Sequence, residues 1–440
     1  MSDYKYSKYN HHGQLEDGSV LVYNLFSSAV AVLSQEEFQQ ISNPTLMYNP
    51  ELYEIAASQG FLVPADEDET AKLLSLRNTN NFNDKRAGFQ ILPTTSCNAR
   101  CFYCYEQDFQ PSTMTKETAD AVVSFLLDYC ENMEDVTVAW FGGEPFVCEG
   151  LMDYISSKLI PALEARGTRY QANVITNASL ISTQNIEKIV AQYRISNVQI
   201  TLDGRGEEHT RRKKYLDPAV TYEKIIDTIA LLTRHQVHVM VRLNLDRNNL
   251  ESCIGAIEDL ANSGADQDYL WPYGAPLYSD CGGTHCLSEG ELNAAFEKLY
   301  RKLIDCGYIR SIDGLPMNFA NAACCAKILN NFVISPNGEL SKCEHLLNVP
   351  EEVIGSVFDG IRFNAAMAKW TDPAIPAACM DCSYLPICQA GCSAAEQRGF
   401  GYGRCSHIAF IQDAVISAAN YLLRKRGEKD DDSEKQQRDL

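Results

Sequence analysis

Three closely spaced cysteines are the residues whose types and spacing point most directly to chemistry. Cys97, Cys101 and Cys104 follow the pattern C-x3-C-x2-C. Three thiolates on one loop can hold three corners of a [4Fe–4S] cube, which normally takes four cysteines. One iron then stays open to a small ligand that binds through an amine and a carboxylate. A zinc site and incidental thiols are the alternative interpretations of this triplet.

A second field of cysteines lies toward the C-terminus. Its spacing is C-x12-G-x4-C, followed by C-x2-C-x5-C-x3-C and one final cysteine. The seven members are Cys325, Cys343, Cys379, Cys382, Cys388, Cys392 and Cys405. A zinc ribbon would use two C-x2-C pairs, and this field holds one. The whole chain has 17 cysteines, an odd number that disfavours a complete disulfide framework and favours metal binding.

The composition narrows the classes of function. Lys and Arg total 38 against 58 Asp and Glu, which gives a net charge of −20 over 440 residues. This acidic balance predicts no nucleic-acid partner, because binding to the phosphate backbone needs clustered Lys and Arg. Two short basic clusters, Arg211–Lys214 and Arg424–Arg426, are interpreted as solvated faces. With 45% hydrophobic and 22% charged residues, the chain has the composition of a folded protein, and its length allows two to four domains.

No segment of the sequence predicts a membrane span or a secretory signal. Apolar stretches such as Ala121–Leu127 are interrupted by charged residues within a turn or two, well short of the ~20 residues that a bilayer requires. The N-terminal residues Met1–Gly13 are polar and lack the apolar core of a signal peptide. The sequence therefore predicts a cytoplasmic protein with no membrane partner, in a reducing compartment where disulfides do not persist.

Strand and helix patterns alternate from about residue 86 to 305 and would place the triplet at a strand end. Apolar strands are predicted at Gly88–Thr94, Val136–Phe141, Tyr170–Thr176, Val198–Leu202, Val237–Leu245 and Tyr269–Tyr273. Amphipathic helices are predicted between them, for example at Lys116–Tyr129, Thr183–Gln192 and Tyr222–His235. These repeated units predict an α/β fold, a partial (β/α)6 barrel with its reactive loops at the strand C-termini.

Smaller units flank the predicted barrel. Residues 1–85 are predicted to form a small α+β module of the winged-helix type, with a capped helix that opens at Ser34 and a polar linker at Asn78–Lys85. Residues 306–423 are predicted to be loops dense in Cys, Gly and Pro. Residues 424–440 are nearly all charged or polar and are predicted to be a disordered tail.

The triplet and its surroundings resemble the radical SAM superfamily. In that family the three cysteines bind the cluster, and the residue before the last cysteine, here Tyr103, lies against the adenine of S-adenosylmethionine (SAM). The segment Phe141–Pro145, which reads F-G-G-E-P after the second predicted strand, is similar to the family's GGE motif. Gly142 and Gly143 would let the backbone approach the ligand closely, and Glu144 would take the methionine ammonium group.

Polar residues at later strand ends also match the family. Asn177 and Thr201 would hydrogen-bond the ribose of SAM, and Arg242 would pair with its carboxylate. Asp203 belongs to a T-L-D-G segment that resembles the end of the family's fourth strand, and it would also face the bound SAM. Each has a simpler alternative, since Asn177 and Asp203 are also turn formers and Arg242 can pair with Asp246 or Glu207.

The second cysteine field matches the SPASM pattern of radical SAM enzymes. In that family the seven cysteines support two auxiliary clusters, so the resemblance implies three [4Fe–4S] clusters in all. Four cysteines would hold the outer auxiliary cluster, namely Cys379, Cys382, Cys388 and Cys405. Three would hold the inner one, namely Cys325, Cys343 and Cys392. The fourth inner ligand stays open, and the candidates are Cys324, which directly adjoins Cys325, Cys306, and the pair Cys281 and Cys286.

The resemblance also implies a reaction class. A reduced cluster would cleave SAM, and a 5′-deoxyadenosyl radical would take a hydrogen atom from the substrate. Some peptide maturases of the superfamily share the reading C-F-Y-C-Y-E around Cys104, and many of them join a cysteine sulfur to a carbon. The sequence thus predicts an oxidoreductase that installs thioether cross-links in a ribosomally made precursor peptide. The N-terminal module would bind the peptide's leader as an added strand, and a flavodoxin or ferredoxin would be the reductant.

Two alternatives remain open. A formylglycine-forming sulfatase maturase has the same three-cluster arrangement, but it would need a carboxylate base beside the radical, and no single Asp in the sequence is marked for that role. A non-catalytic Fe–S electron carrier would account for the cysteines. It would not account for Gly142, Gly143 and Glu144 or for a triplet with an open iron.

Overall fold

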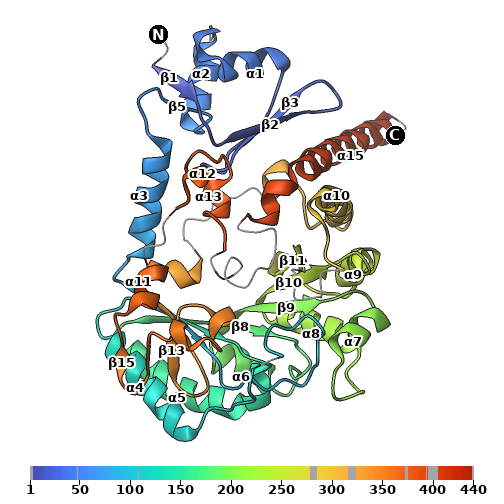
Figure 1. Cartoon of the computed structure of the whole chain (residues 1–440). Helices are drawn as coiled ribbons and strands as arrows, with labels where there is room; N and C mark the ends of the chain where they lie inside the picture. Colours follow the sequence, from blue (N-terminus) through green and yellow to red (C-terminus); the bar gives the residue numbers. More distant parts are fainter. Residues whose placement is uncertain are drawn as a thin grey trace.

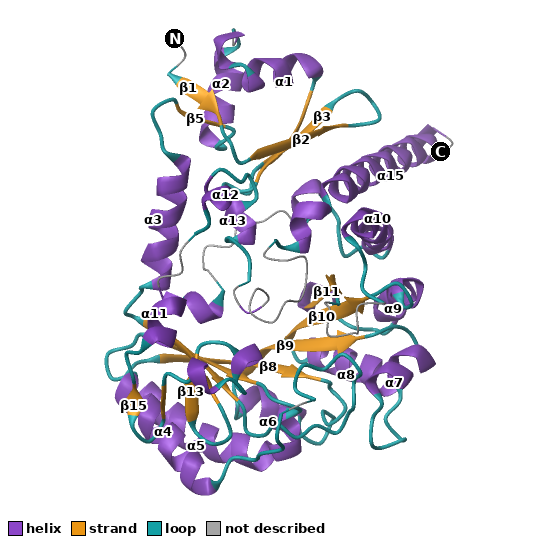
Figure 2. Ribbon diagram, in the orientation of Figure 1, coloured by secondary structure: helices purple, strands orange, loops and turns teal. Residues whose placement is uncertain are grey.

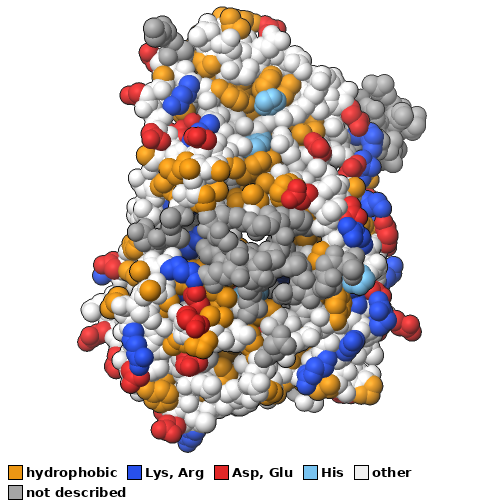
Figure 3. Space-filling view, in the orientation of Figure 1, with side chains coloured by type: hydrophobic (Ala, Val, Ile, Leu, Met, Phe, Trp, Pro, Cys, Tyr) orange, Lys and Arg blue, Asp and Glu red, His pale blue; other side chains and the backbone are white. Residues whose placement is uncertain are grey.

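The structure is a computed structural model (Figure 1). It describes residues 3–46, 48–107, 109–277, 285–315, 324–371, 375–392, 394 and 405–438. Within these ranges no helix is both long and apolar enough to cross a membrane. On the face shown in Figure 3, Lys and Arg side chains are interspersed with Asp and Glu.

Six parallel strands in chain order form the centre of the molecule (Figure 2). Their bounds are β6 Arg86–Ile91, β7 Asp135–Trp140, β8 Arg169–Thr176, β9 Ile195–Leu202, β10 His238–Leu245 and β11 Leu270–Pro276. The helices that follow them are α4 Lys116–Tyr129, α5 Glu149–Ala165, α6 Ile186–Ala191, α7 Glu207–Lys213, α8 Tyr222–Arg234, α9 Leu250–Asn262 and α10 Glu289–Asp305. The predicted partial (β/α)6 barrel is confirmed.

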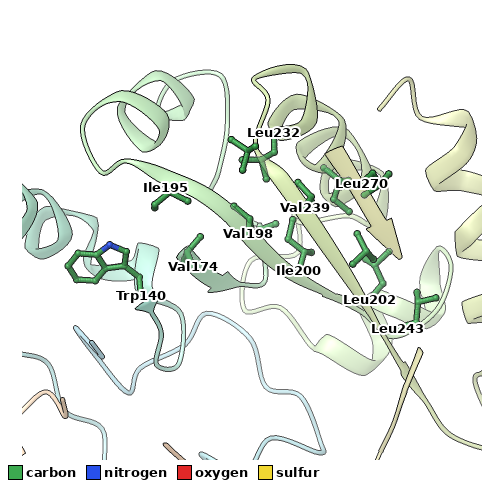
Figure 4. Packing of buried hydrophobic residues seen from close by; sticks show 14 of the residues in the cluster. Trp140, Val174, Ile195, Val198, Ile200, Leu202, Leu232, Val239, Leu243 and Leu270 are labelled. Carbon is green, nitrogen blue, oxygen red and sulfur yellow. The ribbon is translucent and has the colours of Figure 1, made fainter. Parts of the chain in front are cut away.

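The alternation of side chains along these strands creates two different faces. Val136, Val138 and Trp140 of β7 are buried in the core, whereas Thr137 and Ala139 line a cavity inside the barrel. The other strands contribute their outward apolar residues to the same core (Figure 4). The helices therefore attach to the outer face, and the inner face is left for ligands.

A seventh parallel strand extends this sheet beyond β6. The strand β12 Asn331–Ile334 pairs in parallel with β6, and the antiparallel strands β13 Glu339–Ser341, β14 Gly355–Ser356 and β15 Gly360–Ile361 follow it. The sequence predicts only loops here, and that prediction is wrong because strands of two to four residues are too short to show a periodic pattern. As a result, the second cysteine field begins on the same sheet that carries the triplet.

The N-terminal module contains two small antiparallel sheets and two helices. β1 Tyr4–Tyr6 pairs with β5 Leu62–Pro64, and β2 Asn10–Gln14, β3 Val20–Asn24 and β4 Val30–Leu33 form the other sheet. The helices are α1 Gln35–Ser42 and α2 Pro50–Ser58. The predicted capped helix opens at Ser34, whose side chain and that of Glu37 form a capping box.

A helix replaces part of the predicted linker between this module and the barrel. The helix α3 spans Glu69–Asn81, so the Asn-rich start of residues 78–85 is helical. Arg77 of α3 is buried and donates a hydrogen bond to the carbonyl of Leu385 at 3.0 Å. Tertiary contacts of this kind stabilise a helix in a segment whose polar composition favours a loop.

The C-terminal segment also differs from the prediction. Three short helices, α11 Ala365–Thr371, α12 Ala377–Met380 and α13 Leu385–Cys388, precede the long helix α15 Gln412–Arg438. The sequence predicts a disordered tail over residues 424–440, but α15 continues through residue 438. Lys and Arg are good helix formers, and Arg426 donates a hydrogen bond to the carbonyl of Arg310 at 2.7 Å.

Helix α15 connects the N-terminal module to the barrel. It contacts both α10 of the barrel and β2 of the module (Figure 1). Gly13 of β2 faces Ile416 of α15 so closely that a Cβ at Gly13 would lie 2.2 Å from Ile416 Cδ1. Nearby, the backbone N–H of Glu16 donates to Asn420 Oδ1 at 2.9 Å. The two ends of the chain therefore fix each other in place.

Replacing Gly13 by Ala is expected to lower the thermal unfolding midpoint, because the new methyl group would overlap Ile416. Overpacking of this kind costs about 1–3 kcal/mol. Adding Ile416→Ala should recover part of the loss, so the two changes would not be additive. The control is Gly150→Ala, since no heavy atom lies within 4 Å of a Cβ at that position. Calorimetry that found equal midpoints for Gly13→Ala and the unchanged protein would contradict the contact.

Candidate active site

A cavity of about 680 Å³ opens at the C-terminal ends of the first four barrel strands. Its lining brings together predicted residues from four separate segments of the chain. They are Cys97, Cys101, Tyr103, Cys104, Gly142, Gly143, Asn177 and Thr201. The topology explains this convergence, because the carboxyl ends of parallel strands meet at one edge of a barrel.

The backbone before the triplet requires the two glycines of the G-G-E segment. Gly143 donates its N–H to the carbonyl of Thr94 at 3.2 Å, and Glu144 donates to that of Ser96 at 3.0 Å. A Cβ would lie 2.2 Å from the Thr94 oxygen at Gly142 and 2.3 Å from the Ser96 oxygen at Gly143. The sequence analysis attributes these glycines to close approach of the ligand, whereas the structure shows close approach of the cysteine loop.

Glu144 is fully buried at the end of β7. Its carboxylate accepts hydrogen bonds from the backbone N–H of Asn177 and from Thr176 Oγ1, both at 2.8 Å, and from the backbone N–H of Phe146 at 3.2 Å. Burial raises the pKa of Glu144 to about 7, although these hydrogen bonds act in the opposite direction. The carboxylate joins the ends of β7 and β8, and its contact with a methionine ammonium group stays a prediction.

Asn177 connects the end of β8 to the triplet. Its Nδ2 donates to Asn98 Oδ1 at 2.8 Å and lies 3.9 Å from Cys97 Sγ, while its Oδ1 accepts from Ser179 Oγ at 2.6 Å. Ala178 has a φ of 65°, so this segment also makes the tight turn of the alternative interpretation. Asn177 thus holds the loop of Cys97 in addition to lining the cavity.

Tyr103, Asp203 and Lys213 form a buried network beside the triplet. The Tyr103 hydroxyl donates to Asp203 Oδ2 at 2.6 Å, and Lys213 Nζ donates to the Tyr103 oxygen at 3.1 Å. Lys213 Nζ also lies 3.6 Å from Asp203 Oδ2. Burial lowers the pKa of Lys213, but the charges of Asp203 and the triplet thiols outweigh it and raise that pKa above its usual value. Lys213 lines the cavity, so a buried cation stands next to three thiols.

The basic segment Arg211–Lys214 is only partly a solvated face. Its outer two residues are exposed as expected, but Arg212 and Lys213 are each 4% exposed, so the interpretation is wrong for these two. Arg212 forms an ion pair with the buried Asp246. His209 is buried on the same helix, three residues before Arg212, and this spacing is the sequence signal that could have indicated a buried face.

Three predicted SAM contacts, Glu144, Asp203 and Arg242, are not among the described residues that line the cavity. Asp203 is fully buried and accepts from Asn244 Nδ2 at 3.2 Å. Arg242 Nε donates to Asn244 Oδ1 at 3.0 Å. One alternative partner of Arg242, Asp246, is paired with a different arginine, so that alternative is wrong. The roles of these three residues toward SAM stay predictions.

A family model of the radical SAM superfamily matches residues 91–260, from the end of β6 into α9. The chain contains a radical SAM domain. A radical SAM domain implies SAM and one [4Fe–4S] cluster. The residues present fit both, because three thiols line one cavity and Lys213 supplies a buried positive charge beside them.

Similar proteins include two curated enzymes and a solved structure. The cysteine-type anaerobic sulfatase-maturating enzyme of Clostridium novyi (strain NT) is 24% identical over 375 residues, which are 77% of this chain and 98% of that enzyme. The serine-type enzyme of Klebsiella aerogenes is 25% identical over 330 residues, 68% of this chain and 77% of that enzyme. The solved structure of native anSMEcpe with bound AdoMet and Kp18Cys peptide shares the fold, with a TM-score of 0.54 at 17% identity. The match covers 77% of this chain and 98% of the anSMEcpe chain.

The predicted outer ligands gather on the C-terminal side of the radical SAM domain. Burial raises the pKa of Cys405, and the charges of Cys388, Cys379 and Cys382 raise it further, so these four thiols lie near one another. The structure thus brings together four cysteines that the sequence separates by up to 26 positions. An outer cluster at this group stays a prediction.

The predicted inner ligands form a second group. Burial raises the pKa of Cys343, and the charges of Glu344, Cys324 and Cys392 raise it further. A hydrogen bond to Cys324 and burial raise the pKa of Cys325, and the charges of Cys324, Glu344 and Cys343 add to this shift. Cys324 is hydrogen-bonded to Cys325. The adjacent Cys324 therefore lies with the three predicted ligands, which its position in the sequence disfavours.

Cys306, another candidate for the inner cluster, does not join this group. Cys306 follows the C-terminus of α10, where burial raises its pKa and the charge of Lys302 opposes this. Cys286 is disulfide-bonded, contrary to the expectation that the chain holds no disulfide. Cys281 lies outside the described residues. Within the described ranges, no three Cys, His, Asp or Glu side chains are placed to hold a single metal ion.

The triplet loop and the inner group touch through Tyr105 and His345. Their ring centroids are 4.1 Å apart, and Tyr105 follows Cys104 directly while His345 lies two residues after Cys343. Glu106, the next residue, lines the cavity, and burial together with a nearby carboxylate raises its pKa to about 7. No pattern in the sequence marks these three residues, because only the folded chain brings the two loops together.

Replacing Lys213 by Met is expected to lower the reduction potential of the triplet cluster, because losing a buried positive charge disfavours the added electron. It should also destabilise the fold by about 3–5 kcal/mol, since Asp203 would lose its charged partner. Lys158→Met is the control, because this lysine is exposed on the outer helix α5 and pairs with Asp120. Redox titration followed by electron paramagnetic resonance measures the potentials, and equal values in the two variants would contradict the role of Lys213.

Replacing Gly143 by Ala is expected to remove about four irons per chain after anaerobic reconstitution, the content of one [4Fe–4S] cluster. The added Cβ would overlap the backbone before the triplet and displace the cysteine loop. Iron analysis and the resonance spectrum of the reduced protein measure the loss. Gly150→Ala should bind as much iron as the unchanged chain, and the same result for Gly143→Ala would show that the loop tolerates the overlap.

Proposed function

We propose that the protein is a radical SAM enzyme that installs Cys sulfur-to-carbon thioether cross-links in a ribosomally made precursor peptide. The observation that carries this proposal is the N-terminal module, residues 3–64, attached to the radical SAM barrel. The Clostridium novyi enzyme is matched over 98% of its length, yet about a quarter of the present chain has no counterpart in that alignment. An added module fits an enzyme that recognises its peptide at a site apart from the modified residue.

Strand β4 of this module supports the capture of a leader peptide. In the described part of the chain it pairs with β3 on one side and forms the edge of its sheet. An extended peptide can add to such an edge through backbone hydrogen bonds. Apolar side chains are also exposed on the module (Figure 3), among them Val32, Leu46, Tyr48 and Ile55. Apolar residues of a leader would cover part of this surface.

The cavity residues have distinct tasks in the proposed reaction. SAM and the cluster, when bound, would supply a radical that takes a hydrogen atom from a substrate carbon. Cys97, Cys101 and Cys104 hold the cluster. Lys213 balances part of the negative charge of the cluster on its buried side, which water does not reach. Tyr103, fixed by two buried hydrogen bonds, offers a ring to the adenine.

Thioether formation also needs an electron acceptor. A hydrogen atom leaves the carbon, a proton leaves the thiol, and one electron leaves as the C–S bond forms. The second cysteine field supplies ligands for auxiliary clusters that can take this electron, and the contact between Tyr105 and His345 places that field beside the triplet. A flavodoxin or ferredoxin is the proposed source of the electron that activates SAM.

Formylglycine formation on a protein substrate is the second candidate. Its support is the likeness to the two anaerobic sulfatase-maturating enzymes, at 24% and 25% identity. That reaction oxidises a Cys or Ser and requires a carboxylate base, and Glu106 is a carboxyl group at the cavity. The products separate the two candidates, because a thioether retains the cysteine sulfur and formylglycine does not.

Co-expression with a Cys-containing precursor peptide tests the main proposal. Mass spectrometry is expected to show the loss of two hydrogens per linkage, and the linked cysteines should resist alkylation. Peptide with all of its thiols free would refute thioether formation. Loss of the sulfur atom from the modified residue would support the second candidate instead.

Replacing Cys101 by Ala is expected to abolish reductive cleavage of SAM and with it all peptide modification, because two thiolates do not hold the cube reliably. The released 5′-deoxyadenosine is measured by chromatography after reduction with dithionite. Cys148→Ala is the matched control, since this cysteine lies outside both cysteine groups. Cleavage that survived in Cys101→Ala would remove the basis for the cluster assignment.

A further inference from the structure

The inner face of the barrel exposes large apolar side chains on its last two strands. Met240 on β10 and Trp271 on β11 are 41% and 46% exposed, and they are direct neighbours in the parallel register. Both faces of a parallel sheet are normally buried. An exposed Trp and Met side by side on such a face indicate a surface that a ligand covers.

Arg242 lies two residues further along β10 on the same face. In the register it stands between Thr201 of β9 and Tyr273 of β11. Its Nε donates to Asn244 Oδ1 at 3.0 Å, and no carboxylate of the described residues forms an ion pair with it. A half-buried guanidinium with spare N–H donors attracts a carboxylate. This positive group is a local exception in a chain whose net charge is −20.

These residues reach the triplet cavity without a break. We call Gln199, Met240, Arg242, Trp271 and Tyr273 the inner strip. Gln199 neighbours Met240 in the register and accepts a hydrogen bond from the Tyr273 hydroxyl at 3.0 Å, which fixes both side chains. Thr201, the neighbour of Arg242, lines the cavity itself. A peptide that lies along the inner strip therefore leads into the cavity.

We propose that the inner strip binds the part of the substrate peptide next to the modified residue and selects a segment in which an acidic side chain adjoins an apolar one. Arg242 donates hydrogen bonds to the acidic side chain, and Trp271 and Met240 contact the apolar side chain. This inference rests on the proposed peptide substrate and adds the chemistry of the residues that flank the modification site. It also gives Arg242 a ligand other than SAM.

Three matched peptides test this inference by calorimetric titration into the reconstituted protein under anaerobic conditions. The probes are acetyl-Ala-Leu-Glu-Leu-Ala-amide and its counterparts with Lys or Gln in place of Glu. The unchanged protein should bind the Glu peptide at least about tenfold more tightly than the Lys peptide. Arg242→Glu should reverse this preference, and the gain in binding of the Lys peptide shows that the variant is folded. Trp271→Ala should weaken the binding of all three peptides by a similar factor, because it removes apolar contact and no charge.

The matched control for the charge change is Arg301→Glu on the outer helix α10, where Arg301 is exposed and pairs with Glu297. It should leave the preference for the Glu peptide unchanged. Equal affinities for the Glu and Lys peptides, or a preference that Arg242→Glu does not alter, would overturn the inference. Cleavage of SAM by the unchanged protein is measured separately, so a failure of the proposed function and a failure of the inner strip give different results.

Discussion

The arrangement of the site depends on one buried ammonium group, that of Lys213. Three thiols that must become thiolates line the cavity and Asp203 is buried beside it, and several negative charges held close together away from water would repel one another. Lys213 stands among them, with hydrogen-bonding contact to Tyr103 and ion-pair contact to Asp203. The helix α7 positions the Lys213 ammonium group beside the triplet. This helix begins five residues after β9 ends, and it buries Arg212 and Lys213 together.

The barrel could be predicted from the sequence because its elements are long enough to show a period. The helix at Lys116–Tyr129 has the predicted bounds, and the strand predicted at Val136–Phe141 is displaced by one residue. Once the strands and their order are known, the meeting of the triplet with Gly142, Gly143, Asn177 and Thr201 follows, because parallel strands end at one edge. The candidate site was therefore predictable to the extent that it is made of strand ends.

The remaining features depend on contacts that no local pattern carries. The Asn-rich start of residues 78–85 is helical because Arg77 is held by a carbonyl more than 300 residues away in the sequence. The charged tail is helical where it continues α15. The sequence predicts that Arg212 and Lys213 are solvated, because the chain places their partners Asp246 and Asp203 beside them only when it folds. The reason for the two glycines also changes, since the atoms that exclude a Cβ belong to the chain itself.

The pairing of β12 with β6 sets the distance between the two cysteine fields. Val333 lies opposite Gln90 although the two residues are far apart in the sequence, and the spacing of paired strands, about 4.7–4.9 Å, is a property of the backbone alone. Loops on the barrel can therefore lengthen, shorten or change composition over generations without altering the strand pairing that sets the separation of the two cysteine fields. Variation in what the enzyme recognises is thereby separated from the geometry that its redox chemistry requires.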